Sequence, residues 1–280
     1  MYETLAVFLF FFCWSGLGIT IGYHRLLSHR SFGCPKFVEY FFVLGGYLAY
    51  HGSPLWWATM HRAHHRHVDT ALDPHSPEFG GITNAYIGWI NHKTYPAHID
   101  PLKQSKDLTN DPIYRFLEQG GNWYKGLAVN IILNTLVRVA IWAVFGWQAA
   151  LATVVSGLLI LQIPLLLNVV CHMPKLGYKN YKMADDSVNV WWVALMAFGE
   201  GWHNNHHNDP GAAKTGEKWH EFDVSWLTIS AMKKLGLVNR INLGRKSKAP
   251  LAAKPAEPVV IAMPVAKQVS APVPVAVGSR

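Results

Sequence analysis

Long apolar segments alternate along the chain with segments rich in histidine and charge. Residues 4–23 (TLAVFLFFFCWSGLGITIGY) are twenty positions without a charge, and a helix of that length extends about 30 Å, enough to cross a bilayer. From Val139 to Cys171 another thirty-three positions carry no charge, which is too long for one untilted crossing, so we expect a turn near residues 145–148 (FGWQ). The pattern predicts membrane spans at about 4–23, 126–145 and 148–170.

Charged and polar residues near the predicted spans support this interpretation. Glu3 is the only charged residue before the first span, and no cleavage site of small residues follows it, so the segment is not typical of a signal peptide. Asn134 and Arg138 fall inside the second predicted span. Polar groups at that depth should face the protein interior or a cavity.

A fourth apolar stretch, residues 37–60, is interrupted by Gly45, Gly46, His51 and Pro54. Histidine clusters lie on both sides of it, and if they build one site they must lie on the same side of the membrane. The stretch then crosses the membrane twice or not at all, and twenty-four residues are too few for two helical crossings. We therefore expect it to lie in the membrane interface.

Composition and charge agree with a membrane protein. Of the 280 residues, 50% are hydrophobic and only 15% are charged, against about 25% charged in typical soluble domains. The formal net charge is +8, but the basic residues are scattered without a nucleic-acid-binding motif, so we expect no nucleic-acid partner. A membrane surface or an acidic protein fits better. All 25 lysines and arginines except Arg138 fall on the histidine side, which the positive-inside tendency makes cytoplasmic.

These patterns predict an all-α integral membrane protein with about three transmembrane helices, the interfacial segment and a helical cytoplasmic cap. Residues 1–245 would form one domain, with the cap built from residues 61–125 and 172–245. Residues 246–280 are rich in alanine, proline and valine, so we expect a disordered tail there. We expect reduced, buried thiols without a disulfide at Cys13, Cys34 and Cys171.

Eight of the fifteen histidines form three short boxes. The boxes are HxxxxH at His24 and His29, HxxHH at His61, His64 and His65, and HxxHH again at His203, His206 and His207. On a helix, positions i, i+3 and i+4 share a face, so each HxxHH box can offer three imidazoles to one place. So many imidazoles exceed the ligands of one tetrahedral zinc ion and indicate two metal ions.

Three functions are compatible with two histidine-bound metal ions. Two zinc ions could catalyse hydrolysis, but such sites usually contain carboxylate bridges, and no HExxH motif is present. A metal transporter usually places its ligands within the spans near the midplane, whereas these boxes lie at span ends and in the cap. Iron with nitrogen ligands and open positions fits oxygen chemistry at a C–H bond.

Three motifs resemble the histidine boxes of membrane fatty acyl desaturases, most closely the Δ9, stearoyl-type group and its bacterial relatives. They are HRLLSH (24–29), HRAHH (61–65) and GEGWHNNHH (199–207), and NVVCH (168–172) resembles a further NxxxH element of that family. The resemblance implies an O2-dependent acyl desaturase with two iron ions and no catalytic residue beyond the metal centre. By this match the ligands are His24, His29, His61, His64, His65, His172, His203, His206 and His207, with Asn168 reaching one metal through water.

The same resemblance implies the reaction and its partners. Two hydrogens would leave adjacent methylenes of a saturated acyl chain, as acyl-CoA or acyl-lipid, to give a cis double bond at Δ9 in the bacterial inner membrane. The sequence has no HPGG element of a fused cytochrome b5 and no GxGxxG motif. An external electron donor (ferredoxin, rubredoxin or a cytochrome b5-like protein) with its reductase is therefore expected. Family members normally have another span before HRLLSH, so we expect a shortened start or three crossings.

Further residues have candidate roles around the site. Glu200, Asp69 and Asp73 could orient ligand imidazoles, because metal-bound histidines usually donate their other N–H to a carboxylate. A bent apolar tunnel would hold the acyl chain, with candidate wall residues Trp56, Trp57, Trp191 and Trp192. We expect hydrogen bonding and not metal binding for His51, His67, His75, His92, His98 and His220. Membrane hydroxylases and alkane monooxygenases share the histidine pattern, and product analysis would separate them from a desaturase.

Overall fold

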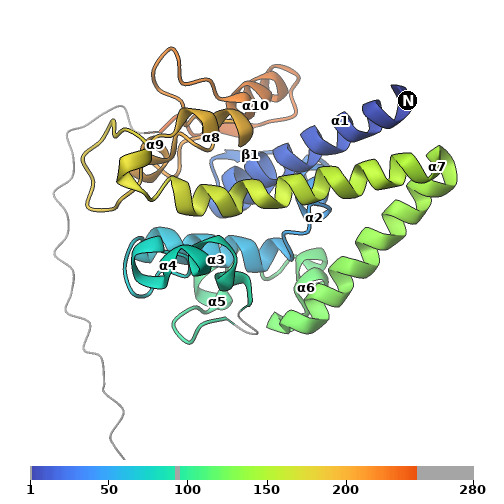
Figure 1. The fold of residues 1–280 in the computed structure, drawn as a ribbon, viewed down its shortest axis with the longest axis horizontal. Helices are drawn as coiled ribbons and strands as arrows, with labels where there is room; N and C mark the ends of the chain where they lie inside the picture. Colours follow the sequence, from blue (N-terminus) through green and yellow to red (C-terminus); the bar gives the residue numbers. More distant parts are fainter. Residues whose placement is uncertain (1, 92–94, 245–280) are drawn as a thin grey trace, which may run out of the picture.

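The computed structural model of the chain describes residues 2–91 and 95–244. Helices dominate this part of the chain, and the shorter ones gather at one end of two long apolar helical segments (Figure 1). The tail predicted at 246–280 and the predicted hydrogen-bonding residue His92 lie outside the described residues.

The chain begins with α1 (Tyr2–Leu17), which continues directly into a π-helical segment, η1 (Gly18–Ser28). The remaining helices are α2 (Lys36–Tyr47), α3 (Pro54–His67), α4 (Pro77–Tyr86), η2 (Gly88–Asn91), α5 (Pro101–Gln104), α6 (Pro112–Glu118), η3 (Gln119–Gly121), α7 (Trp123–Val170), η4 (Pro174–Leu176), α8 (Trp191–Met196), α9 (His203–Asn208) and α10 (Val224–Lys234). One short antiparallel pair joins β1 (Phe32–Gly33) to β2 (Arg240–Ile241), with Phe32 opposite Ile241.

Two helical segments of the described chain are long and apolar enough to cross a membrane. The first combines α1 and η1 over Tyr2–Ser28, 27 residues that extend beyond the predicted 4–23, and an 18-residue stretch of it has a mean hydropathy of 2.0. The second is α7, 48 residues, within which an 18-residue stretch has a mean hydropathy of 2.3. A left-handed backbone at Gly146 (φ 81°) breaks α7 into the two arms seen in Figure 1, in agreement with the turn expected at 145–148. That these arms are separate membrane crossings remains a prediction.

The predicted interfacial stretch at 37–60 is not one element, because α2 ends at Tyr47 and α3 begins at Pro54. The twelve residues of α2 extend about 18 Å, too short to cross a bilayer of about 30 Å. One face of α2 packs on α1 and η1. Its other face exposes Phe37, Phe41 and Leu44 at helical spacing. This apolar outer face suits a helix in contact with lipid, and its interfacial position remains a prediction.

Glycines allow η1 and α2 to approach each other very closely. A Cβ atom at Gly18 would lie 2.2 Å from the backbone nitrogen of Gly46 and 2.6 Å from the carbonyl carbon of Gly45. Backbone atoms cannot move aside as the end of a flexible side chain can. Small residues at such crossings permit the backbone contact that holds apolar helices together. This contact fixes the element that carries the first histidine box.

Asn134 and Arg138 both face the protein interior, as predicted for polar groups at that depth. Both are buried, with 2% and 8% of their surface exposed. The Asn134 amide donates to the carbonyl of Tyr47, and the Arg138 guanidinium donates to that of Leu48 (2.9 Å) and lies over the ring of Tyr50. Tyr47 is the last residue of α2 and Leu48 caps it, so neither carbonyl is bonded within the helix. The polar side chains of α7 therefore stabilise the end of α2 away from water.

The three cysteines are free, as expected. Cys171 is buried and Cys34 is partly buried, but Cys13 is exposed on α1. The prediction of burial was wrong for Cys13, because an apolar run does not distinguish the outer face of a helix from its packed face.

We predict that Gly18→Ala lowers the midpoint of thermal unfolding in detergent, because the new methyl group clashes with the backbone of α2. Overpacking of this kind costs about 1–3 kcal/mol. Gly126→Ala is the matched control, since a Cβ atom there meets nothing closer than 3.6 Å. Intrinsic tryptophan fluorescence during heating measures both. Equal midpoints for the two variants would contradict the close contact.

Candidate metal centre

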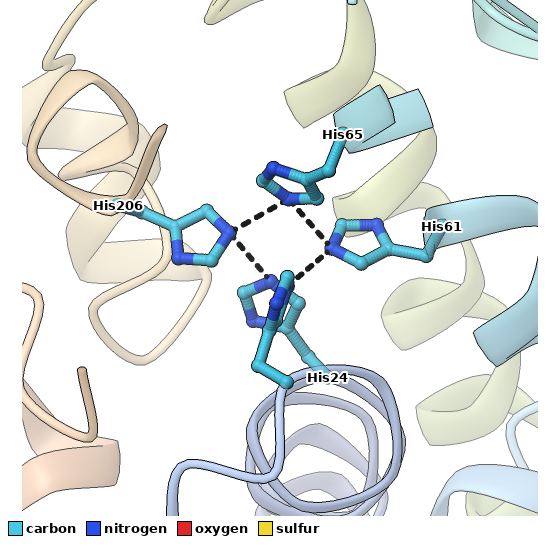
Figure 2. A group of neighbouring side chains, drawn as sticks. His24, His61, His65 and His206 are labelled. Atoms are coloured by element: carbon cyan, nitrogen blue, oxygen red, sulfur yellow. Dashed lines mark hydrogen bonds between the residues drawn. The ribbon is translucent and has the colours of Figure 1, made fainter. Parts of the chain in front are cut away.

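Nine histidines meet in two neighbouring groups. The candidate ligand atoms of each group lie within 4.8 Å of one another. The five-histidine group consists of His24, His29, His61, His65 and His206. The four-histidine group consists of His64, His172, His203 and His207. The structure thus brings together all nine histidines identified from the sequence, and in Figure 2 the labelled rings of the first group point at a common centre.

Each HxxHH box is divided between the two groups. On α3, His61 and His65 belong to the five-histidine group, whereas His64 belongs to the other. On α9, His206 joins the first group and His203 and His207 join the second. The expectation that one box serves one place was therefore wrong. Side chains at i+3 and i+4 share a helix face but lie about 100° apart around the axis, enough to reach two adjacent points.

The π-helical segment η1 explains the HxxxxH spacing of the first box. On an α-helix, residues five apart lie about 140° apart around the axis, on different faces. In a π-helix the hydrogen bond joins residues five apart, and the His29 amide donates to the carbonyl of His24 at 3.2 Å. The two rings consequently lie 4.8 Å apart. A π-helix of eleven residues is rare, and the sequence analysis did not foresee it.

The third box lies on α9, a helix of only six residues. Helices this short are unstable unless other parts of the protein hold them. Asn204 and Asn205, the two asparagines inside the box, are buried and hold α9 in place. Asn204 accepts from the backbone amides of Asn180 and Tyr181, and Asn205 donates to Thr215 and Glu221. Loops on both sides of α9 therefore fix the three imidazoles.

The last turn of α7 supplies the NVVCH element. His172 directly follows the helix and its Nε2 lies 3.1 Å from that of His203. Asn168 lies one turn earlier and lines an apolar cavity together with His61, His64 and His203. Its side chain is thus beside the four-histidine group, and its proposed contact through water remains a prediction.

Carboxylates contact the far nitrogens of several of these rings. The Nδ1 atom of His64 lies 2.9 Å from Asp73 and that of His172 lies 3.0 Å from Asp69, as the sequence predicted. The Nδ1 atom of His24 lies 2.6 Å from Glu200 Oε2, although the pair is not aligned as a hydrogen bond. Asp185, 3.7 Å from Nδ1 of His207, was missed, because nothing in the sequence relates it to a box.

The ring nitrogens fit a metal ion better than they fit one another. A neutral imidazole carries one proton, and a carboxylate at Nδ1 draws it there, which leaves Nε2 with an unshared electron pair. The Nε2 atoms of the four-histidine group nevertheless lie 3.0–3.4 Å apart in the pairs His203–His207, His172–His203 and His64–His207. Nitrogen ligands at about 2.1 Å and at right angles around one ion are about 3.0 Å apart. The donor set is therefore that of a metal site.

The five-histidine group has the same spacing. Its Nε2 atoms are 2.8 Å apart for His29 and His61, 3.1 Å for His61 and His65, 3.0 Å for His65 and His206, and 3.1 Å for His24 and His206. Rings of the two groups approach to 4.5 Å at His65 and His207. Two ions could therefore lie side by side, which agrees with the two metals indicated by the number of imidazoles.

Two arginines inside the boxes hold the backbone that carries the ligands. Arg25 is buried (1% exposed) and donates to Glu200 (2.9 Å), to both carboxylate oxygens of Asp223, and to Thr215 and Ala213. Burial alone would raise the pKa of Asp223, but Arg25 and the hydrogen bonds hold it below its usual value. Glu200 thus links Arg25 to His24. The sequence analysis missed this network, although Arg25 stands inside HRLLSH.

Arg62 holds the C-terminal end of η1 in place. Its Nε donates to the carbonyl of Ser28 (2.9 Å) and its Nη2 to that of Leu27 (2.5 Å). These are carbonyls of the last turn of η1, directly before His29. A cation at the C-terminal end of a helix also suits the helix dipole. Arg62 therefore joins the first box to α3, and it too was missed.

An apolar cavity reaches both histidine groups. Gly16, Ile160, Ile163, Leu167 and Phe198 are part of its wall, and His24, His61, His64 and His203 also line it. A second cavity is lined by Trp56, Trp89 and Glu118. A smaller cavity shares Trp57 with both, and Asn168 with the first. The three cavities therefore share wall residues beside the histidines, and a bent tunnel through them remains a prediction.

Of the tryptophans considered for a tunnel wall, Trp57 and Trp56 line these cavities. The Trp57 ring stacks on that of His61, with centroids 4.9 Å apart. Trp191 is 63% exposed and Trp192 packs beside Leu167, and neither lines the three cavities.

The other described histidines lie outside both groups, as expected. His75 stacks on His64 (4.2 Å) and, with Asp73 and His64, forms a third possible ligand set. Nε2 of His51 lies 3.5 Å from the carbonyl of Ile160 and that of His98 lies 2.9 Å from the carbonyl of Leu72. The ring of His67 lies near that of His98, and His220 is exposed beside Trp219.

We predict that Asp73→Asn weakens metal binding about 10–100-fold, because His64 loses the carboxylate that orients its ring. Competition with a chelator, followed by metal analysis, measures this. Asp186→Asn is the control, because it removes a carboxylate from the neighbouring loop without touching a group histidine. A metal affinity equal to that of the unchanged protein would contradict the role of Asp73.

We predict that the metal-free protein loses stability as the pH falls from 7 to 5. Burial and then the neighbouring histidines hold the pKa of His64, His203 and His207 well below the usual 6.5. Below about pH 6.5 these histidines are protonated in the unfolded chain but stay neutral in the folded chain. Proton binding therefore favours the unfolded state as the pH falls. Above about pH 6.5 the histidines are neutral in both states, so the metal-free protein keeps its full stability. The midpoint of thermal unfolding against pH measures it, and a flat profile would contradict burial of neutral rings.

The chain matches the fatty acid desaturase family over residues 3–223. An sn-1 stearoyl-lipid 9-desaturase of Anabaena variabilis is 39% identical over 82% of this chain and 80% of the relative. A protein of the same name from Synechocystis sp. is 37% identical over 84% of this chain and 70% of the relative. An sn-2 palmitoyl-lipid 9-desaturase of Nostoc sp. is 34% identical over 82% of this chain and 83% of the relative. This chain belongs to the fatty acid desaturase family and is an oxidoreductase that acts on acyl chains.

Proposed function

We propose that the enzyme introduces a cis double bond at carbon 9 of a saturated acyl chain in a membrane lipid. The relatives are named as desaturases of stearoyl-lipids and palmitoyl-lipids, which favours an acyl-lipid over acyl-CoA. One O2, two substrate hydrogens, two electrons and two protons give the unsaturated chain and two water molecules. The proposal assigns no separate acid or base to this reaction, because a saturated C–H bond offers neither an acidic proton nor an electrophilic centre.

Two iron ions are the proposed cofactor. The five-histidine group would hold one, and the four-histidine group, with Asn168 through water, would hold the other. Bound iron supplies the activation of O2 that removal of hydrogen from an unactivated methylene requires. The carboxylates Asp69, Asp73 and Glu200 keep the imidazoles oriented, and Arg25 keeps Glu200 in place.

The cavity residues position the acyl chain. Ile160, Ile163 and Leu167 offer an apolar surface to methylenes, and His24, His61, His64 and His203 line the same space. An apolar wall also excludes water, which would compete for the metals. Trp57 stacks on His61 and lines the cavity, so it would hold the chain at a fixed distance from that imidazole.

We place the enzyme in the bacterial inner membrane with its histidines on the cytoplasmic side. The apolar helices and the exposed apolar face of α2 support contact with lipid. The basic residues lie almost entirely on the histidine side, which favours the cytoplasm. Reducing equivalents for the reaction would come from a soluble carrier and its reductase on that side.

The single observation that carries the proposal is an apolar cavity whose wall contains members of both histidine groups. We predict that expression in a host without its own desaturase produces cis-Δ9 monoenes, detected by gas chromatography of the fatty acids. His206→Ala and His207→Ala should abolish them, because each removes a ligand from a different group. His220→Ala, an exposed histidine outside both groups, should leave the product unchanged.

Other products would redirect the assignment. Hydroxylated chains would move the enzyme to the related oxygen-inserting chemistry. Purified protein that binds iron and receives electrons, yet forms no modified acyl chain, would contradict the proposed reaction. A double bond at another carbon would leave the desaturation intact and overturn only the position.

A further inference from the structure

The two histidine groups differ in their access to the surface. All four rings of the four-histidine group are buried, whereas His29, His61 and His65 of the five-histidine group are partly exposed. For His61 the apolar cavities account for part of this exposure, since it lines two of them. His29 and His65 line none of the three cavities. Each is followed directly by an exposed arginine, so both rings lie next to the outer surface of the protein.

The surface beside His29 and His65 is positively charged. We define the basic face as Arg30, Arg62, Arg66 and Lys106 together with the one acidic residue among them, Asp107. The Asp107 carboxylate accepts from both Arg30 and Arg62, so one negative charge is shared by two arginines. Arg66 and Lys106 are exposed. On neighbouring α5, Lys103 and Asp100 lie 3.8 Å apart and balance each other.

The chain order places this face next to the exposed imidazoles. Arg30 directly follows His29, and Arg66 directly follows His65. Arg62 lies one turn before Arg66 on α3 and contacts both the end of η1 and the segment that contains Asp107. The positive charge thus surrounds the place where the five-histidine group meets the solvent.

We infer that an acidic protein carrying one electron at a time docks on the basic face and passes electrons through the exposed edges of His29 and His65. This inference rests on the proposed function, which requires two electrons for each double bond. For each double bond, two reduced carriers dock in turn and each gives up one electron. These two electrons contribute to the reduction of O2 to water. Opposite charges on the two proteins speed the encounter and select the partner. Neither His29 nor His65 lines the cavity proposed for the acyl chain, so the carrier would not occupy that cavity.

We predict that the double variant Arg66→Glu, Lys106→Glu weakens the binding of an acidic [2Fe–2S] ferredoxin about tenfold at low salt. Titration calorimetry of the oxidised ferredoxin with the enzyme in detergent measures the Kd without any turnover. The difference from the unchanged enzyme should shrink at high salt, because screening removes it. In turnover assays the KM for ferredoxin should rise while kcat at saturating ferredoxin changes less than about twofold.

Lys175→Glu, Lys234→Glu is the matched control, with the same change in net charge at two exposed lysines outside the basic face. It should leave the Kd within about twofold. A basic carrier, cytochrome c, should show the opposite order and bind the basic-face variant more tightly than the unchanged enzyme. The milder double variant Arg66→Gln, Lys106→Gln gives the same readout with less disturbance if the charge reversal impairs folding.

The results separate the docking site from the reaction. Equal weakening by the control pair, or no weakening by the basic-face pair, would overturn the docking site even if monoenes are formed. Weakening confined to the basic-face pair supports it. If the unchanged enzyme binds ferredoxin as predicted but forms no monoene with excess reduced ferredoxin, the proposed function is wrong and the docking surface is still supported.

Discussion

Several imidazole nitrogens lie about 3 Å apart inside the protein. The rest of the structure must hold the rings at this distance. Without a cation between them, unshared electron pairs at this distance repel, and burial prevents the rings from taking up protons instead. The surrounding groups do not relieve this conflict. Carboxylates at the far nitrogens of His64 and His172 direct the protons away from the centre. The geometry therefore fits a metal site.

Holding this arrangement requires rigid backbone, and much of it comes from short or unusual elements. The π-helical η1 aligns His24 with His29, and the six-residue α9 carries three more rings. Neither is stable by its own backbone alone. Arg25 anchors η1 to the loop before α10, Arg62 closes its last turn, and Asn204 and Asn205 pin α9 to loops on both sides. Buried hydrogen bonds to charged groups are among the stronger ones available.

The two long apolar helical segments both end beside the histidine groups. The first runs from its exposed N-terminal part through the glycine contact with α2 and ends in the first histidine box. The second arm of α7 lies alongside it (Figure 1) and delivers Asn168 and His172 at its end. An apolar cavity lies between these helices, with residues of both in its wall. The two apolar segments proposed to contact lipid thus also supply histidines to the two groups. A lipid chain could therefore reach the histidines along them.

The sequence by itself determined which residues matter and what kind of protein this is. Box spacing identified eight of the nine histidines, and the resemblance of NVVCH to a family motif added His172. The uncharged run predicted the turn near Gly146, and the usual partners of metal-bound histidines suggested the carboxylates Asp69, Asp73 and Glu200. These are local or compositional patterns. Only the tertiary structure decided how each box divides between two groups, that η1 is a π-helix, and which distant residues, such as Asp185 and Asp223, complete the site. These depend on contacts between segments far apart in the chain. Period and composition describe one helix at a time, and the division of ligands arises where several helices meet.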